Sequence, residues 1–180
     1  RDTSEVQIIV HPEPEIESLV LPIVPVCANE NISFQVLTQD TISNIIWDFG
    51  NGDSSLLTDP DYAYTEAGIY PISVTITTAL HDCSKIFEGF VEIIAQPIAL
   101  TTPSTFDGCS PLTIDFQNDS ENSAYYIYEF GDGNTSTNSD PTHTFYSTSD
   151  TSFIIKFVSI NELGCRDSSY LEINVYGQPL

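Results

Sequence analysis

The chain has 180 residues, 41% of them hydrophobic, and carries 26 Asp and Glu against 4 Lys and Arg, a formal net charge of −22. A field of that sign repels phosphate groups, which excludes nucleic acid and anionic membrane surfaces as natural partners. Because no run of 18 apolar residues occurs, we predict no transmembrane helix and no membrane insertion.

The first 14 residues resemble the end of the chain. The segment "RDTSEVQIIVHPEP" (1–14) is similar to "RDSSYLEINVYGQP" (166–179), with Arg-Asp at the start and Pro at the end of each. We therefore predict that residues 1–14 are the last strand of a preceding repeat. The sequence has no Met and no apolar leader segment, so we also expect an interior part of a longer array.

The rest of the chain consists of two copies of one unit, which we predict to be domains 15–97 and 98–180. The segment "IIWDFGNG" (45–52) returns as "YIYEFGDG" (126–133), and an Asp-Pro pair follows each of them. Self-similarity at a fixed period is the signature of tandem repeats. The joints at "HPEP" and "AQP" are short and contain Pro, so we expect them to be stiff.

The local patterns of both copies are those of strands. Segments such as "ISFQV", "YPISVTITT" and "FVEIIA" are rich in β-branched and aromatic residues and alternate with a period near two. Clusters of Asn, Asp, Gly, Ser and Pro separate them, and no segment shows a helical stripe. The sequence predicts an all-β fold, with an antiparallel β-sandwich of about seven strands in each copy.

The repeated aromatic and glycine segment predicts a core strand followed by a hairpin. Alternation along a strand places Trp47 and Phe49 on one face and Asp48 on the other. A buried Trp is common in such sandwiches, and Gly50 and Gly52 tolerate the positive φ angles that tight turns require. The matching residues of the second copy are Tyr128, Phe130, Gly131 and Gly133.

With "WDFGNGD" in one copy and "YEFGDGN" in the other, the chain resembles the PKD family of immunoglobulin-like β-sandwich repeats. The phrases "GCSPLTIDFQNDS" and "LGCRDSS" are most similar to PKD repeats of large secreted surface proteins of Bacteroidota, which include gliding-motility adhesins and type IX secretion substrates. The second copy departs from the pattern at Tyr128 and Glu129, where Trp and Asp are usual. It also has "STSDTSF" where the first copy has "AGIY", which predicts a reshaped loop.

The four cysteines form two pairs with identical spacing. We predict one disulfide in each repeat, Cys27–Cys83 and Cys109–Cys165; metal ligation and a reactive thiol are the alternatives. Disulfides persist in oxidising compartments. The predicted disulfides therefore indicate an extracytoplasmic location. The resemblance to Bacteroidota surface proteins implies a secreted, extracellular protein at the cell surface that is associated with the outer membrane.

The acidic turns are candidate calcium ligands. Oxygen-rich loops can hold calcium, and the candidate residues are Asp53, Asp59, Asp61, Asp132 and Asp140. EF-hand spacing is absent, and the Asp-x-Asp-Gly stretch with which some PKD domains bind calcium has no counterpart here. We favour structural turns over calcium at these positions and expect no other cofactor.

Catalytic signatures are absent from the sequence. His11, His81 and His143 do not recur between copies, and neither a G-x-S-x-G elbow nor an H-E-x-x-H motif occurs, so we predict that the chain is not an enzyme. Most aromatic residues alternate along strands and are interpreted as core. Tyr125 faces opposite to Tyr126 and is the candidate contact for a glycan.

Two functions remain open from the sequence. The first is structural: stalk or spacer repeats of a long secreted surface adhesin, whose partners are neighbouring repeats of the same chain. The second is an accessory PKD module that binds polysaccharide or a surface protein beside the catalytic domain of a secreted hydrolase.

Overall fold

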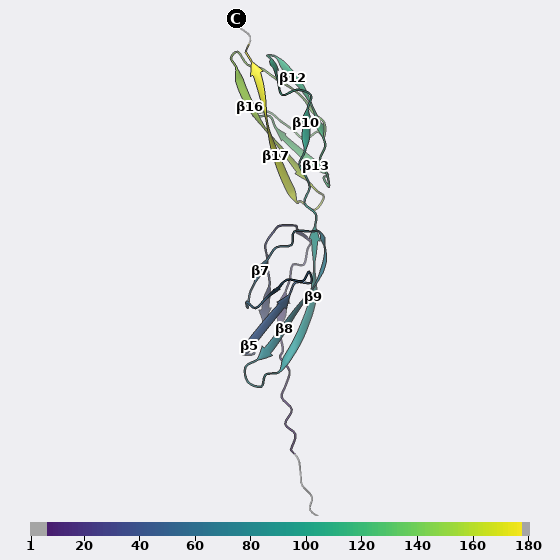
Figure 1. Ribbon diagram of the computed structural model, residues 1–180. Helices are drawn as coiled ribbons and strands as arrows, with labels where there is room; N and C mark the ends of the chain where they lie inside the picture. The colour runs from purple at the N-terminus through teal and green to yellow at the C-terminus, as the bar shows by residue number, and fades with distance from the viewer. Residues whose placement is uncertain (1–6, 178–180) are drawn as a thin grey trace, which may run out of the picture. The chain divides into compact units, whose positions relative to one another are not determined.

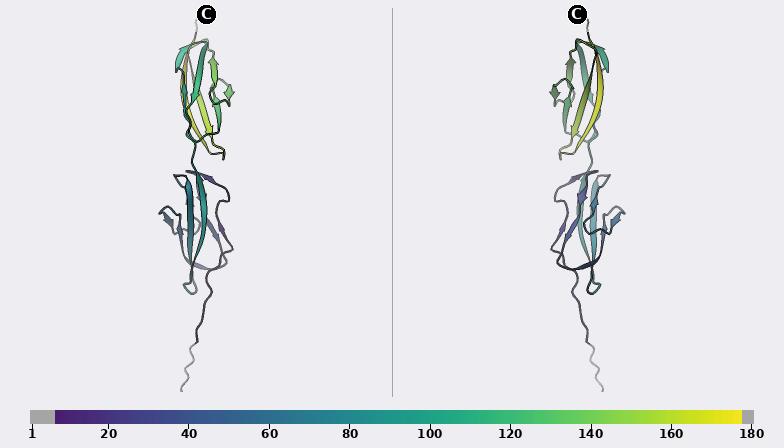
Figure 2. Two further views of the ribbon diagram at one scale, coloured as in Figure 1. Left: turned by 90° about the vertical axis from the view of Figure 1, so that its right-hand side faces the viewer. Right: turned by 90° about the vertical axis from the view of Figure 1, so that its left-hand side faces the viewer.

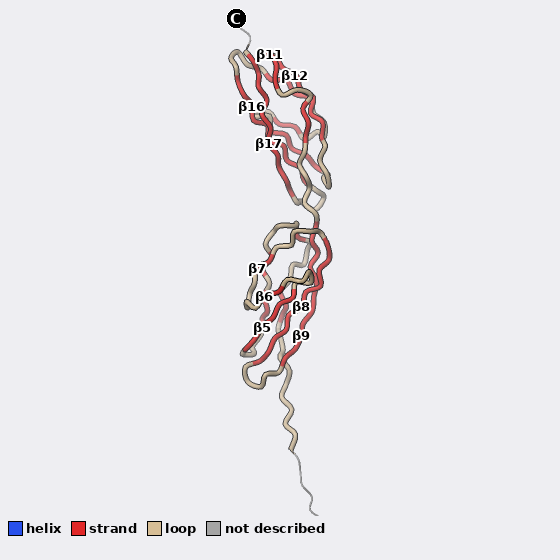
Figure 3. Tube along the Cα trace, viewed as in Figure 1, coloured by secondary structure: helices blue, strands red, loops and turns tan. Residues whose placement is uncertain are grey.

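The computed structural model describes residues 7–177 and separates the chain into two compact all-β units, with the division between Ile94 and Ala95. The predicted boundary lies slightly later, between residues 97 and 98. Figure 3 shows strands and loops throughout both units. Within the described residues, no helix has the length and apolar character needed to span a bilayer. The predicted all-β class is confirmed.

The predicted strand at residues 1–14 lies partly outside the described residues. Residues 7–16 have no assigned strand, and the first strand of unit 1 begins at Ser18. A strand is defined by its pairing partners. A final strand of another repeat would pair with strands of that repeat, which the sequence does not include. The lack of an assigned strand at residues 7–16 therefore does not test this prediction.

Unit 1 is built from a five-stranded sheet in the order β2-β9-β8-β5-β6, together with the two-stranded pairs β1-β4 and β3-β7. Figure 1 labels its strands β5, β7, β8 and β9. The strands are β1 (Ser18–Val20), β2 (Val26–Cys27), β3 (Ile32–Ser33), β4 (Gln35–Leu37), β5 (Ile42–Asp48), β6 (Ser54–Ser55), β7 (Asp61–Tyr62), β8 (Gly68–Thr78) and β9 (Ser84–Ile94).

Unit 2 has a five-stranded sheet in the order β11-β17-β16-β13-β14 and a three-stranded sheet in the order β10-β12-β15. Both views in Figure 2 show the strands of each unit as two facing layers. The strands are β10 (Thr101–Pro103), β11 (Asp107–Cys109), β12 (Leu112–Asn118), β13 (Tyr125–Glu129), β14 (Thr135–Ser136), β15 (Thr142–Phe145), β16 (Thr151–Ile160) and β17 (Arg166–Tyr176).

Each unit contains one parallel pairing among its antiparallel ones. β2 pairs in parallel with the end of β9, where Cys27 is opposite Ile94, and β11 pairs in parallel with the end of β17, where Cys109 is opposite Tyr176. The early strand thus lies along the last strand and runs in the same direction. This arrangement places Cys27 beside the C-terminal end of β9 and Cys109 beside the C-terminal end of β17.

The hydrophobic core of each unit follows the alternation seen in the sequence. In β8, Ile72, Val74 and Ile76 are fully buried, whereas the residues between them are only partly covered. The cluster of unit 1 also includes Phe34, Trp47, Phe49, Tyr64, Val91 and Ile93. The cluster of unit 2 comprises Ala99, Ile114, Phe116, Tyr128, Phe130, Phe145, Ile155, Phe157, Ile173 and Val175.

Candidate functional site

The repeated motif forms a hairpin that closes in the same way in both units. In unit 1, the backbone N–H of Phe49 donates a hydrogen bond to the carbonyl of Asp53 at 3.0 Å; in unit 2, Phe130 donates to Asn134 at the same distance. Gly50 and Gly52 have φ angles of 75° and 100°. The predicted positive-φ hairpin is confirmed.

One side-chain oxygen recurs inside the two turns. The Oδ1 atom of Asn51 accepts a hydrogen bond from the backbone N–H of Asp53 at 3.2 Å. In unit 2, Oδ1 of Asp132 accepts from Asn134 at 2.9 Å. An amide oxygen and a carboxylate oxygen serve the turn equally well. The two turns therefore share an accepting oxygen atom and differ in charge.

The large aromatic residue before each turn is buried and anchored at its polar tip. Trp47 and Tyr128 are both fully buried. Trp47 Nε1 donates to the carbonyl of Thr58 at 3.4 Å, and the Tyr128 hydroxyl donates to the carbonyl of Ser139 at 3.0 Å. Because Thr58 and Ser139 lie just before the Asp-Pro pair in each unit, two different rings reach the same backbone position. The interpretation of the motif as core is confirmed.

Two of the three candidate calcium ligands of unit 1, Asp53 and Asp61, have separate hydrogen-bond partners. Asp53 accepts from the hydroxyl of Tyr62, and Asp61 accepts from the hydroxyl of Ser33. Asp59 is exposed. Asp53 and Asp61 thus each bind a different hydroxyl group.

In unit 2, Asp140 accepts from the backbone N–H of Asn118 at 2.8 Å, and this bond lowers the pKa of its carboxyl. Asp132 belongs to the hairpin. Across residues 7–177, no group of three or more His, Cys, Asp or Glu is arranged to hold a metal ion. Calcium binding stays a prediction from sequence.

A ring stacks on the motif phenylalanine in each unit, a contact that the sequence did not reveal. Tyr62 lies parallel to Phe49 with centroids 4.2 Å apart, and His143 lies parallel to Phe130 with centroids 4.0 Å apart. His143 Nε2 is 2.8 Å from Oδ2 of Asp132. Both residues come shortly after the Asp-Pro pair, and that spacing was the only signal. In this position His143 packs on the core and contacts the turn.

The hairpin of unit 2 should weaken in acid. Partial burial by itself would raise the pKa of Asp132, but hydrogen bonds from Asn134 and His143 outweigh it and lower the pKa below its ordinary value. The stabilisation by Asp132 is then complete above the ordinary carboxyl pKa and is lost as the pH falls through the folded-state value. Asp132→Asn introduces the residue type that unit 1 has at the equivalent position, Asn51. In this variant, the stability of unit 2 should fall less steeply as the pH is lowered.

Circular dichroism melts at a series of pH values between about 5 and 2 measure this effect. Glu162→Gln, at an exposed position outside the hairpin, is the matched control. An acid limb of the same steepness in Asp132→Asn and wild type would contradict the role given to Asp132.

The predicted disulfide pairing within each repeat is wrong. Cys83 and Cys109 are free cysteines, whereas Cys27 and Cys165 are disulfide-bonded. The physical reason lies in the strands. Cys27 is opposite the last residue of β9, and Cys83 directly precedes its first residue. The two cysteines of unit 1 therefore lie at opposite ends of one long strand. The spacing of cysteines in the sequence does not reveal this separation.

Tyr125 has the exposure expected of a ligand contact. Its side chain is 61% exposed on β13, while Tyr126 beside it is packed against the core of unit 2. Tyr170 on β17 is 64% exposed. Sheet pairing places Tyr125 opposite Ile160 and Tyr170 opposite Lys156, so the two rings belong to separate rows.

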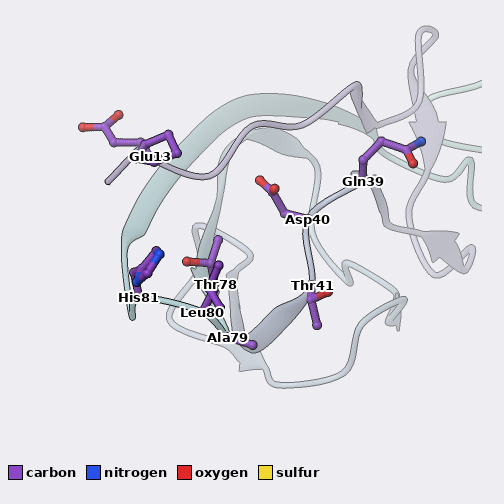
Figure 4. A pocket seen from close by; sticks show the side chains of 9 residues that line it. Glu13, Gln39, Asp40, Thr41, Thr78, Ala79, Leu80 and His81 are labelled. Carbon is purple, nitrogen blue, oxygen red and sulfur yellow. The ribbon is translucent and has the colours of Figure 1, made fainter. Parts of the chain in front are cut away.

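A hollow of about 470 Å³ lies at the end of unit 1 that contains the β8–β9 turn. Figure 4 shows Glu13 on the N-terminal segment, Asp40 between β4 and β5, and Thr78 to His81 around it. Asp40 accepts from the backbone N–H of Glu15 at 2.9 Å, and His81 stacks on His11 with centroids 3.4 Å apart. These contacts hold the N-terminal segment against the unit.

The paired sheets and repeated hairpins define both units as immunoglobulin-like β-sandwiches in tandem. The family model described as PKD domain matches residues 12–86. No match to a curated protein is found.

Solved structures similar to the chain include two PKD domains. The PKD1 domain of the Vibrio cholerae metalloprotease PrtV is 25% identical, over 45% of this chain and 98% of that domain, with a TM-score of 0.38. The PKD domain of the human receptor SorCS2 is 21% identical, over 52% and 85%, with a TM-score of 0.38. The Bacteroides ovatus protein SGBP-B, solved with a mixed-linkage heptasaccharide, is 14% identical over 93% and 48%, with a TM-score of 0.36.

Proposed function

We propose that the two sandwiches are non-catalytic PKD-type spacer repeats of a long secreted protein at the cell surface. The proposal extends the PKD match of residues 12–86 to unit 2 through the repeated motif. We further propose that the parent protein is an adhesin whose distal region these repeats present, of the kind that Bacteroidota export by type IX secretion for gliding motility. The assignment to an adhesin, to type IX secretion and to gliding motility rests on the sequence resemblance alone.

The observation that carries this proposal is what the two units share. They repeat the buried ring, the hairpin bond and the core, while charged groups change between equivalent positions: Asn51 becomes Asp132, and Tyr62 becomes His143. A binding or catalytic site would need the chemistry to persist in at least one complete copy. A spacer needs only the packing. The net charge of −22 also discourages association between neighbouring molecules.

The proposal is tested in cells that produce the parent protein. Exchanging residues 15–180 for two unrelated β-sandwiches of similar length should leave adhesion unchanged, and deleting them should lower it. Loss of adhesion after the exchange would show that these residues contribute contacts of their own.

The alternative function, polysaccharide binding beside a hydrolase, rests on the exposed ring of Tyr125. Aromatic faces of this kind can stack on sugar rings. As spacers, the two sandwiches should pass through columns of insoluble polysaccharide without retention. Retention that Tyr125→Ala abolishes, and that the more exposed control Tyr146→Ala preserves, would favour the alternative.

A further inference from the structure

The outer surface of the five-stranded sheet in unit 1 exposes apolar side chains from three adjacent strands. Core residues of β8 alternate with residues that point away from the core. Pairing places Ile46 of β5 and Ile86 of β9 on either side of Thr75. The exposed apolar residues of this surface, which we call the isoleucine face, are Ile46, Ile69, Pro71, Ile86 and Phe90. Contiguous apolar patches on the surface of a soluble protein mark sites of interaction.

The sandwich fold does not require this apolar surface. Trp47 and Tyr128 occupy equivalent positions, and following the strand pairing outward from them aligns the two sheets. In unit 2, polar residues replace three of the apolar ones: Ser152 replaces Ile69, Ser168 replaces Ile86 and Glu172 replaces Phe90. Unit 2 forms a sheet of the equivalent strand order with these polar residues. The isoleucine face is therefore specific to unit 1.

The isoleucine face is acidic at its polar positions. Asp48 of β5 and both Glu88 and Glu92 of β9 are exposed on it. Within the described part of unit 1, no Lys or Arg lies on this face, because Lys85 is opposite the buried Ile76 and so lies on the other surface of the sheet. An occupant must therefore supply apolar side chains without adding negative charge, which a second isoleucine face would do.

The outer surface of the five-stranded sheet in unit 2 has the matching character. Two of the chain's four Lys and Arg residues, Lys156 and Arg166, lie on this surface. Arg166 is in one row with Ile160 and Tyr125, and Tyr170 is opposite Lys156. The side chains that we call the tyrosine face are the exposed Tyr125, Ile154, Arg166 and Tyr170, together with the partly exposed Lys156.

The charges on the tyrosine face balance. Glu129 forms an ion pair with Lys156, with Oε1 and Nζ 3.1 Å apart, and Glu172 is the other exposed acid. Arg166 is exposed and belongs to none of the ion pairs found across residues 7–177. In a protein with a net charge of −22, this face therefore offers aromatic and aliphatic surface without net charge, and a guanidinium group that can bind a carboxylate.

We propose that the tyrosine face of one molecule docks on the isoleucine face of another copy of the same chain. Tyr125 and Tyr170 cover apolar side chains, and Arg166 approaches the carboxylates of the isoleucine face. The contact joins two different surfaces, so a bound pair keeps one unoccupied face of each kind and can extend into an open row. The inference goes beyond the spacer function, because it lets spacers of neighbouring molecules associate, and it does not depend on the adhesin assignment.

The contact is small and reversible. Each face spans three strands, about 14 Å, and extends about 23 Å along them. This footprint is less than half of the roughly 800 Å² that each partner of a standard interface buries. The net charge of −22 opposes the approach of two molecules, but salt at about 0.15 M confines that repulsion to about 8 Å. Many repeats in parallel would add their contacts through avidity.

Sedimentation equilibrium on the 180-residue chain tests this contact. Phe90→Glu disables the isoleucine face, and the double variant Arg166→Ser/Tyr170→Glu disables the tyrosine face. Each introduced residue is the one that the other unit has at the equivalent position, so both variants are compatible with the fold. Tyr146→Glu, at an exposed ring outside both faces, is the matched control. The variants are measured alone and as an equimolar mixture, in about 0.15 M salt and at up to about 1 mM protein, the effective concentration that short linkers create between modules.

We expect each face variant alone to remain monomeric. Their mixture should reach the mass of a dimer and stop there, because it retains one complementary pair of faces. Wild type and Tyr146→Glu should grow beyond the dimer as the concentration rises. Dimers of Phe90→Glu alone would indicate contact between two tyrosine faces, and dimers of the double variant alone would indicate contact between two isoleucine faces. Either result, or a mixture that stays monomeric, would overturn the proposal.

Discussion

Replacing Gly50 with alanine should destabilise unit 1 by about 3 kcal/mol, because two costs combine at one position. Gly50 has a φ of 75°, in the left-handed region that residues with a Cβ rarely adopt. An added Cβ would also overlap the carbonyl oxygen and ring of Pro71 at the β8 side of the hairpin. Backbone at such close range cannot move aside without disturbing the sheet.

The matched control is two residues away in the same turn. Gly52 has a φ of 100°, but a Cβ there would meet no atom within 4 Å. Gly52→Ala therefore carries only the conformational cost, about 1–2 kcal/mol. Urea unfolding followed by fluorescence measures both, because the single Trp of the chain is Trp47, in the core of unit 1. Equal losses in the two variants would show that the contact with Pro71 has no energetic weight.

The sequence was sufficient for features that depend on local pattern. Alternation in "YPISVTITT" correctly indicated a strand, now part of β8, and the spacing of Trp47 and Phe49 correctly placed both rings on one buried face. The glycines of the hairpin were predictable because positive φ selects glycine almost by itself. These features follow from strand period and turn geometry, which act over a few residues.

Features that depend on long-range strand pairing could not be predicted from the sequence. Two cysteines with the same spacing in both repeats could not reveal that an 11-residue strand separates them. The parallel pairing of β2 with β9 joins residues far apart in the chain and leaves no periodic signal. The rings that stack on Phe49 and Phe130 were missed for a different reason: Tyr62 and His143 are different residue types, and only their contact is repeated.

Truncating Tyr128 to alanine should have the largest effect of any single change in unit 2. The ring is fully buried and packs on Phe116, Phe130 and Phe157, with centroids 4.4–6.0 Å from its own. Removing it leaves a cavity in the centre of the cluster, and such losses cost about 3–5 kcal/mol. The hydrogen bond to the carbonyl of Ser139 is lost as well.

Two variants separate packing from the polar contribution. Tyr128→Phe keeps the ring and removes only the hydroxyl, which also lies 3.2 Å from Oγ1 of Thr101, and should cost about 1 kcal/mol. Tyr125→Ala removes an exposed ring from the same strand and should be nearly neutral.

Thermal melts by circular dichroism report both units, while Trp47 fluorescence reports unit 1 alone. If the units fold on separate cores, Tyr128→Ala lowers one transition and leaves the fluorescence transition in place. A shift of the Trp47 transition by the same amount would mean that the two sandwiches unfold as one.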